Sequence, residues 1–100
     1  MAQHRSGDYV YEKITDWPKM PKGQTMGVVS RVATDSQDRV YVFQRKDPPV
    51  VVFDRDGNFI KSWGEGVFPR AHGVHVGPDE TLWLTDDADH TVRQCTLDGK

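Results

Sequence analysis

Two side chains in this sequence have the chemistry of an active site, Arg45 and His72. An arginine can hold a carboxylate or developing charge through its planar fork of donors. Beside Lys46 and Asp47, Arg45 could instead form a surface ion pair of little energetic value. His72 could bind a metal or line a channel. A catalytic zinc needs about three protein ligands, and alternation along a strand predicts that His72 and His75 point to opposite faces. The chain therefore supplies at most one ligand to such a metal.

Acidic residues gather at Asp86, Asp87 and Asp89. Carboxylates are calcium ligands, but this spacing differs from that of an EF-hand loop. We expect a solvated loop here.

Composition excludes several classes of function. Lys and Arg number 13 against 15 Asp and Glu, so no basic surface for nucleic acid is expected. No apolar run is long enough to span a membrane, and no signal peptide is visible, which predicts a cytoplasmic location by default. Glycine-rich phosphate loops and the GxSxG, HExxH and CxxC motifs are absent from the sequence. The single cysteine, Cys95, cannot form an internal disulfide.

The sequence repeats itself after 42 residues without a gap. Val40–Phe43 aligns with residues 82–85, and the turn pair Asp56-Gly57 aligns with Asp98-Gly99. A period in the low forties with several short strands per period is typical of a β-propeller with one blade per repeat. We therefore predict an all-β fold. Propellers close with about 4–8 blades, so this chain would form only part of the ring.

Apolar runs and turn residues place the strands. Asp56-Gly57 is a strong hairpin signal that favours a type I′ turn, and runs apolar on both faces, such as Val50–Phe53, indicate a sheet covered on both sides. We predict a loose polar tail at residues 1–8, with residues 1–25 forming this tail, a closing strand and a loop, residues 26–67 forming blade 1, and residues 68–100 forming blade 2 without its fourth strand. Strands are predicted at residues 9–14, 29–34, 40–44, 50–54, 58–63, 73–76, 81–85 and 91–96.

Three stretches carry a family resemblance: Ser30–Asp35, Val40–Arg45, and Ala71–Val74 leading to residues 84–86 and 90–92. Over residues 26–100 the chain resembles the NHL-repeat propeller of peptidyl-α-hydroxyglycine α-amidating lyase and its bacterial relatives. In that comparison His90 takes the place of the Asn-His-Leu histidine, and we expect it to be a hydrogen-bonding structural residue.

The resemblance implies a six-bladed propeller and a set of site residues. It places a zinc ion near the central axis, with His72 as one of its ligands, and an arginine, Arg45, facing the active site. It also places a structural calcium on the backbone carbonyls of Val32 and Val74. The catalytic tyrosine of that family, its second arginine and its other zinc ligands have no assigned counterpart in these 100 residues.

Three interpretations of function stay open. The first is part of a metal-dependent lyase that converts a peptide-like substrate to an amide and glyoxylate, with the 100-residue chain inactive alone. The second is a non-catalytic NHL propeller that binds a protein or a ligand. The third is a unit that completes its ring with other copies of the chain, in which residues 9–14 would supply the outer strand missing from a neighbour's blade 2.

Overall fold

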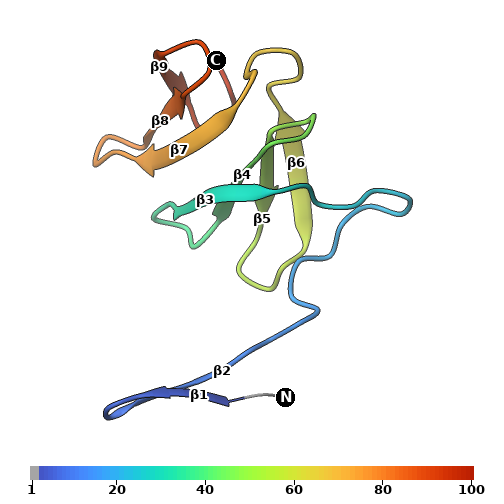
Figure 1. The fold of residues 1–100 in the computed structure, drawn as a ribbon, viewed down its shortest axis with the longest axis vertical. Helices are drawn as coiled ribbons and strands as arrows, with labels where there is room; N and C mark the ends of the chain where they lie inside the picture. Colours follow the sequence, from blue (N-terminus) through green and yellow to red (C-terminus); the bar gives the residue numbers. More distant parts are fainter. Residues whose placement is uncertain (1–2) are drawn as a thin grey trace.

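The computed structural model describes residues 3–100, and all of its regular elements are strands. Three antiparallel sheets follow one another along the chain (Figure 1). The expected all-β fold is confirmed. The strands are β1 (Gln3–Ser6), β2 (Tyr9–Glu12), β3 (Val29–Thr34), β4 (Val40–Gln44), β5 (Val50–Phe53), β6 (Phe59–Trp63), β7 (Ala71–Val76), β8 (Thr81–Asp86) and β9 (Thr91–Thr96).

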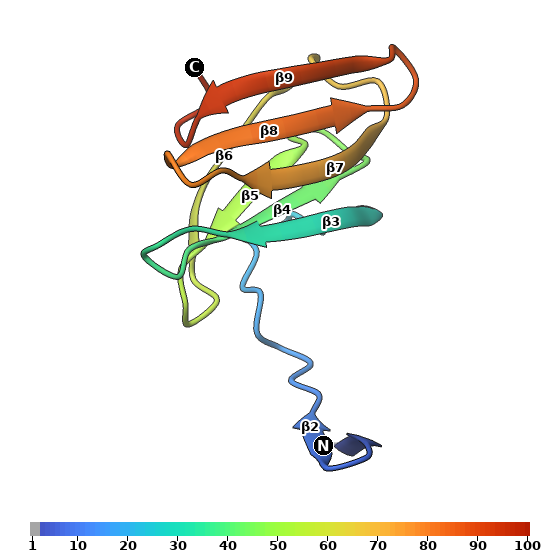
Figure 2. The ribbon, with the colours of Figure 1, turned by 90° about the vertical axis from the view of Figure 1, so that its left-hand side faces the viewer.

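The strand order within each sheet is sequential: β1-β2, then β3-β4-β5-β6, then β7-β8-β9. We call the second sheet blade 1 and the third sheet blade 2. Inner strands β3 and β7 lie next to each other, with β7 also against β4, so that the two blades stack (Figure 2). This is the arrangement of neighbouring propeller blades.

The 42-residue repeat holds at the level of single hydrogen bonds. The backbone N–H of Asp35 donates to the carbonyl of Arg39, and Gly77 donates to Thr81 in the same way. Asp38 and Glu80, which are 42 residues apart, both have φ of 60°. Equivalent turn bonds also join residue 54 to 58 and residue 96 to 100.

The turn at Asp56-Gly57 differs from the predicted type I′. Gly57 has φ of 84°, whereas Asp56 is not in the left-handed region. The N–H of Asp54 bonds to the carbonyl of Asn58, and the register shifts next to Phe53. The loop is therefore the three-residue form, in which only the last position needs positive φ and a bulge follows.

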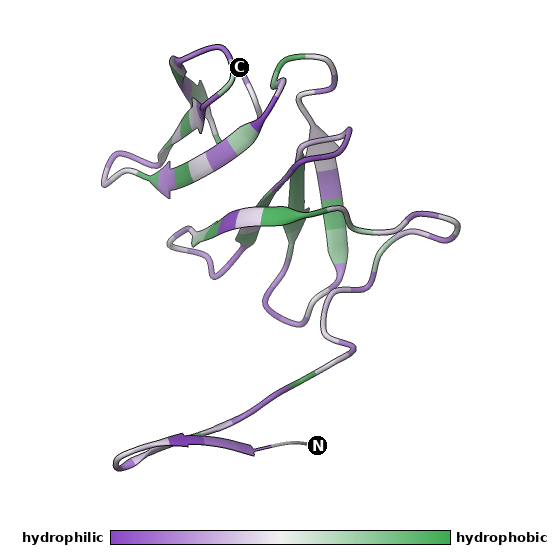
Figure 3. Ribbon diagram, viewed as in Figure 1, coloured by the Kyte–Doolittle hydropathy of each residue, from purple (hydrophilic) through white to green (hydrophobic). Residues whose placement is uncertain are grey.

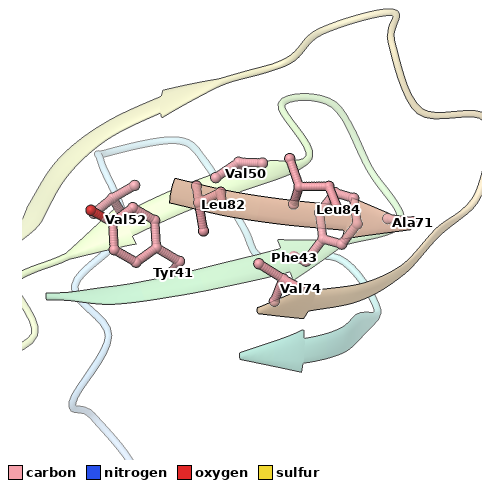
Figure 4. Packing of buried hydrophobic residues seen from close by; sticks show 8 residues of the cluster. All are labelled: Tyr41, Phe43, Val50, Val52, Ala71, Val74, Leu82 and Leu84. Atoms are coloured by element: carbon pink, nitrogen blue, oxygen red, sulfur yellow. The ribbon is translucent and has the colours of Figure 1, made fainter. Parts of the chain in front are cut away.

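A single apolar core joins the two blades. It holds side chains that alternate along β4 and β5 and face β7 and β8 (Figure 4). Both faces of β4 and β5 are buried, as predicted, because a second cluster of Val42, Val51 and Phe53 packs on the other side under Trp17 and Met26. The members of the joint core are Tyr41, Phe43, Val50, Val52, Ala71, Val74, Leu82 and Leu84.

The N-terminal hairpin corrects the expected loose tail. Residues 3–6 form β1, which pairs with β2; residues 1 and 2 lie outside the described residues. Every residue of the hairpin is exposed, and Figure 1 shows it standing apart from both sheets on an extended connection. Its strands are largely hydrophilic in Figure 3, in contrast to β4 and β5. The expected strand at residues 9–14 ends at Glu12.

Candidate functional site

Arg45 follows the last residue of β4 and joins the two blades. Its backbone N–H donates to the carbonyl of Val28 at 2.8 Å, which fixes the strand end. Its side-chain Nε donates to the carbonyl of Ala71 at 3.0 Å, at the start of β7. The residue is exposed, so that its remaining guanidinium donors are free to bind a ligand. The surface ion pair considered for Arg45 is replaced by this hydrogen bond between blades.

Asp87 occupies in blade 2 the position that Arg45 occupies in blade 1. Its backbone N–H donates to the carbonyl of Arg70 at 3.3 Å, 42 residues on from the bond between Arg45 and Val28. The Arg70 Nε lies 2.5 Å from the Asp87 Oδ1. This hydrogen bond and the charge of Arg70 lower the pKa of the Asp87 carboxyl, and the charges of His72 and Arg45 lower it further. Arg70 is therefore the direct partner of the Asp87 carboxylate.

His72 lies in a bulge of β7. The register shifts between Ala71 and Gly73, and Ala71 and Val74, three residues apart, pack into the same core. Alternation across this bulge is lost, so the predicted separation of His72 and His75 onto opposite faces has no basis here. Both histidines are exposed. No group of three or more His, Cys, Asp or Glu side chains with metal-binding spacing is present in residues 3–100.

The residue after His72 must be a glycine because β8 lies close to it. A Cβ at this position would lie 2.7 Å from Thr85 Oγ1, and the Gly73 N–H donates to that same oxygen at 2.9 Å. The hydroxyl of β8 therefore occupies the space that a side chain would need, and the backbone beside His72 is held against β8.

The acidic cluster is not a uniformly solvated loop. Asp86 is buried, and its carboxylate accepts hydrogen bonds from the N–H groups of Arg70, Ala88 and Asp89 at 2.7, 2.9 and 3.0 Å. Burial alone would raise the pKa of Asp86, but these backbone donors lower it overall. Asp86 thereby holds Arg70 and the β8–β9 turn in place, while the Asp89 carboxylate accepts from Thr91.

His90 follows this turn with φ of 60° and is exposed. Its side chain makes no hydrogen bond to any of the described residues, which corrects the expected structural role.

Val32 and Val74 hold equivalent places, as the proposed calcium site requires. Val32 is paired with Val42, and Val74 is paired with Leu84, both in the central part of an inner strand. Their side chains differ, because Val74 is 8% exposed under blade 1 whereas Val32 is 54% exposed.

Sequence reasoning missed Arg70 and Asp87 as members of this site. The signal was available, because Asp87 lies one repeat after Arg45. A hollow of about 380 Å³ lined in part by Gln44, Lys46 and Glu65 lies elsewhere and includes neither Arg45 nor His72.

Known proteins resemble this chain over most of its length. NHL repeat-containing protein 3 of mouse is 35% identical over 100 residues, covering 90% of this chain and 28% of that protein. Peptidylglycine alpha-amidating monooxygenase of rat is 27% identical over 112 residues, covering 87% of this chain and 11% of that protein. The mouse form of the latter is 25% identical over the same share of each chain. No family model matches the sequence.

This chain is a segment of an NHL-repeat propeller. It spans about a quarter of the first relative and about a tenth of the other two. The NHL fold accounts for the all-strand sheets and the stacked inner strands. Arg45 follows β4, Arg70 precedes β7 and His72 lies in β7, and the Arg45 side chain meets the start of β7. No helix of the described residues is long and apolar enough to cross a membrane.

Proposed function

We propose that this chain forms part of an NHL propeller that binds a peptide-like substrate through its carboxylate and cleaves an α-hydroxyglycine C–N bond. The observation that carries the proposal is the hydrogen bond from the Nε of the exposed Arg45 to the Ala71 carbonyl, which places Arg45 at the junction of the blades, against the residue that precedes His72. The similarity to two peptidylglycine alpha-amidating monooxygenases supports it.

The reaction would break the bond between the amide nitrogen and the hydroxyl-bearing carbon. The hydroxyl loses its proton and becomes the aldehyde of glyoxylate, while the amide nitrogen gains a proton and leaves as the peptide amide. Atoms balance without an oxidant. Arg45, fixed through its Nε, would hold the substrate carboxylate with its other donors, since a guanidinium matches a carboxylate in geometry.

His72 fits a metal-binding role as one ligand. It is exposed beside the Arg45 contact to Ala71, and the remaining zinc ligands would come from other blades, because a catalytic zinc needs about three. A bound zinc would polarise substrate oxygens. The carbonyls of Val32 and Val74 would contribute two of the 6–8 oxygens that calcium takes.

A binding module without catalysis is the second candidate. The relative with the higher identity, NHL repeat-containing protein 3, has a name that states no reaction. The exposed guanidinium of Arg45 would then hold an acidic group of a ligand. The formal charge of −2 gives no support to a nucleic-acid partner.

The test measures glyoxylate release from benzoyl-α-hydroxyglycine, on this chain and on the longest natural reading frame that contains it, with and without a chelator. The affinity for benzoylglycine, which cannot be cleaved, is measured in parallel. Arg45→Ala should weaken binding roughly 10- to 100-fold, the value of a charged hydrogen bond. The matched control is Arg55→Ala, on an exposed side chain of the outer hairpin. It should leave both the affinity for benzoylglycine and the release of glyoxylate unchanged.

The outcomes separate the candidates. Glyoxylate release that a chelator abolishes and zinc restores supports the lyase. Binding that depends on Arg45 without release supports the module. If the protein neither binds benzoylglycine nor releases glyoxylate, both candidate functions are wrong.

A further inference from the structure

Arg70 and Asp87 form an ion pair that the proposed reaction does not use. Arg70 precedes β7 and Asp87 follows β8, and the Asp87 backbone N–H donates to the Arg70 carbonyl at 3.3 Å. The Arg70 Nε donates to the Asp87 Oδ1 at 2.5 Å. The pair lies at the same end of blade 2 as the backbone bond between Arg45 and Val28 in blade 1, one period earlier.

The repeat itself shows that neighbouring blades leave these positions open. Val28 and Arg45 belong to blade 1, which has blade 2 packed after it. Val28 is nevertheless 68% exposed, and Arg45 is exposed as well. One period later, the Arg70 side chain is 54% exposed although blade 1 is packed before it. Neither a preceding nor a following blade covers this position, so we expect Arg70 to stay accessible where the propeller continues.

Arg70 is held at both its backbone and its side chain. Its N–H donates to the buried carboxylate of Asp86 at 2.7 Å, and its Nε donates to Asp87. A guanidinium carries further donors on its Nη nitrogens, and in residues 3–100 these make no other hydrogen bond. The bond to Asp87 therefore orients the guanidinium and leaves its Nη edge for a ligand.

Arg45 and Arg70 meet at the start of β7. The Arg45 Nε donates to the carbonyl of Ala71 at 3.0 Å, and the Cα atom of Ala71 is about 3.8 Å from that of Arg70 along the chain. The hydrogen bond from Arg70 is the main cause that lowers the pKa of Asp87, and the charge of Arg45 adds to it. Two guanidinium groups, each anchored through Nε, therefore lie at one junction between blades.

We propose that Arg70 binds a second acidic group of the ligand, so that this protein prefers peptide-like substrates with an acidic residue immediately before the terminal glycine. The inference rests on the proposed function, in which Arg45 holds the carboxylate of that glycine. A guanidinium matches a carboxylate through paired N–H donors. Asp87 offsets part of the charge of Arg70, so the expected gain is that of an ion pair open to solvent.

The test compares the affinities for two peptides that cannot be cleaved, N-acetyl-aspartyl-glycine and N-acetyl-asparaginyl-glycine. They have nearly the same shape and differ by one charge. Both are titrated by calorimetry into the longest natural reading frame that contains this chain, at low ionic strength, where screening is weakest. The aspartyl peptide should bind about 2- to 5-fold more tightly, the value of an exposed ion pair.

Arg70→Ala should remove this preference. It should leave the affinity for the asparaginyl peptide unchanged, which also shows that the variant is folded. Arg70→Lys keeps the charge and should retain part of the preference. Arg45→Ala should weaken the binding of both peptides alike, because both carry the glycine carboxylate. The matched control is Arg55→Ala, on a side chain that is 82% exposed, and it should leave both affinities unchanged.

The outcomes separate this inference from the proposed function. Equal affinities for the two peptides, or a preference that persists in Arg70→Ala, overturn the inference, while binding that depends on Arg45 leaves the proposed function standing. Glyoxylate release is measured separately on the matching α-hydroxyglycine peptides. A preference that depends on Arg70 without any release supports the inference and contradicts the lyase. If neither peptide binds, the inference and the proposed function are both wrong.

Discussion

At the scale of single residues, buried carboxylates hold the turns of this molecule. Asp35 is buried at the end of β3, and its two oxygens accept hydrogen bonds from Gln37, Arg39 and Tyr41. Burial alone would raise the pKa of Asp35, but the hydrogen bonds from Arg39 and Tyr41 lower it overall. Burial and the bond to Asp35 raise the pKa of Tyr41 in turn. Several donors aimed at a carboxylate favour its ionised form.

Asp35→Asn should lower the free energy of unfolding by roughly 1–3 kcal/mol at neutral pH, because a buried amide cannot accept from all of these donors. Since the folded pKa of Asp35 is lowered, its contribution is present above the unfolded value of about 3.9 and disappears as the pH falls through the folded value. Urea unfolding at pH 7 and below pH 4 should show the gap between variant and native chain shrinking in acid. Asp38→Asn, whose side chain is 68% exposed, serves as the control and should be neutral.

Gly73→Ala should lower the free energy of unfolding by about 1–3 kcal/mol, since the added Cβ would lie 2.7 Å from Thr85 Oγ1. Thr85→Ala removes that oxygen. In a double-mutant cycle measured by denaturant unfolding, Gly73→Ala should therefore cost less in the Thr85→Ala background than in the native one. Equal costs in the two backgrounds would mean that the clash is not the reason for glycine beside His72.

At the scale of elements, the outer hairpin of blade 1 depends on the segment before β3. Gly57 has φ of 84°, and a Cβ there would lie 1.8 Å from the carbonyl oxygen of Trp17. The indole Nε1 of Trp17 also donates to the Arg55 carbonyl at 3.0 Å. Glycine is needed here for two reasons, its left-handed backbone and the close approach of another chain segment.

Gly57→Ala should therefore destabilise the chain more than Gly66→Ala. Gly66 has φ of 76°, and a Cβ there would meet nothing within 4 Å, so this control carries the backbone strain alone, about 1 kcal/mol. The additional destabilisation in Gly57→Ala comes from displacing the segment that contains Trp17. It should therefore appear as faster proteolysis within residues 17–26, measured by limited digestion and mass spectrometry. Equal proteolysis of the two variants would contradict the assigned packing of Trp17.

At the scale of the whole molecule, the two blades share one core and should unfold together. Leu82 and Leu84 of blade 2 are 0% exposed, and they pack with Tyr41 and Phe43 of blade 1. The hairpin of β1 and β2 lies outside this unit, and an isolated two-stranded hairpin is marginally stable in water.

Leu84→Ala should lower the free energy of unfolding by about 2–5 kcal/mol, which is the range for truncating a leucine in a packed core. Hydrogen exchange followed by mass spectrometry should show faster exchange in β4 and β5 as well as in β8. The β1–β2 hairpin should exchange rapidly in both forms. If protection is lost in blade 2 alone, the blades are independent units.

Local sequence patterns were enough to predict the all-strand fold, the 42-residue period and most strand limits, including those of β3, β4 and β9. These follow from local preferences, because alternation, β-branched runs and turn residues act over a few neighbouring positions. Arg45 and His72 were identified through the family resemblance rather than through the period. The local patterns did not predict the turn form at Gly57, the strand β1, or the burial of Asp86.

Those features depend on the tertiary structure. Arg45 meets the Ala71 carbonyl only because the two blades stack, whereas Arg70 meets Asp87 because β7 pairs with β8. The bulge at His72 removes the alternation from which its direction was predicted. Val32 and Val74 are equivalent in sequence, yet one is exposed and the other is covered, because among the described residues a blade packs on this face of β7 but not on the same face of β3. Burial is set by contacts between segments far apart in the chain, which local patterns do not encode.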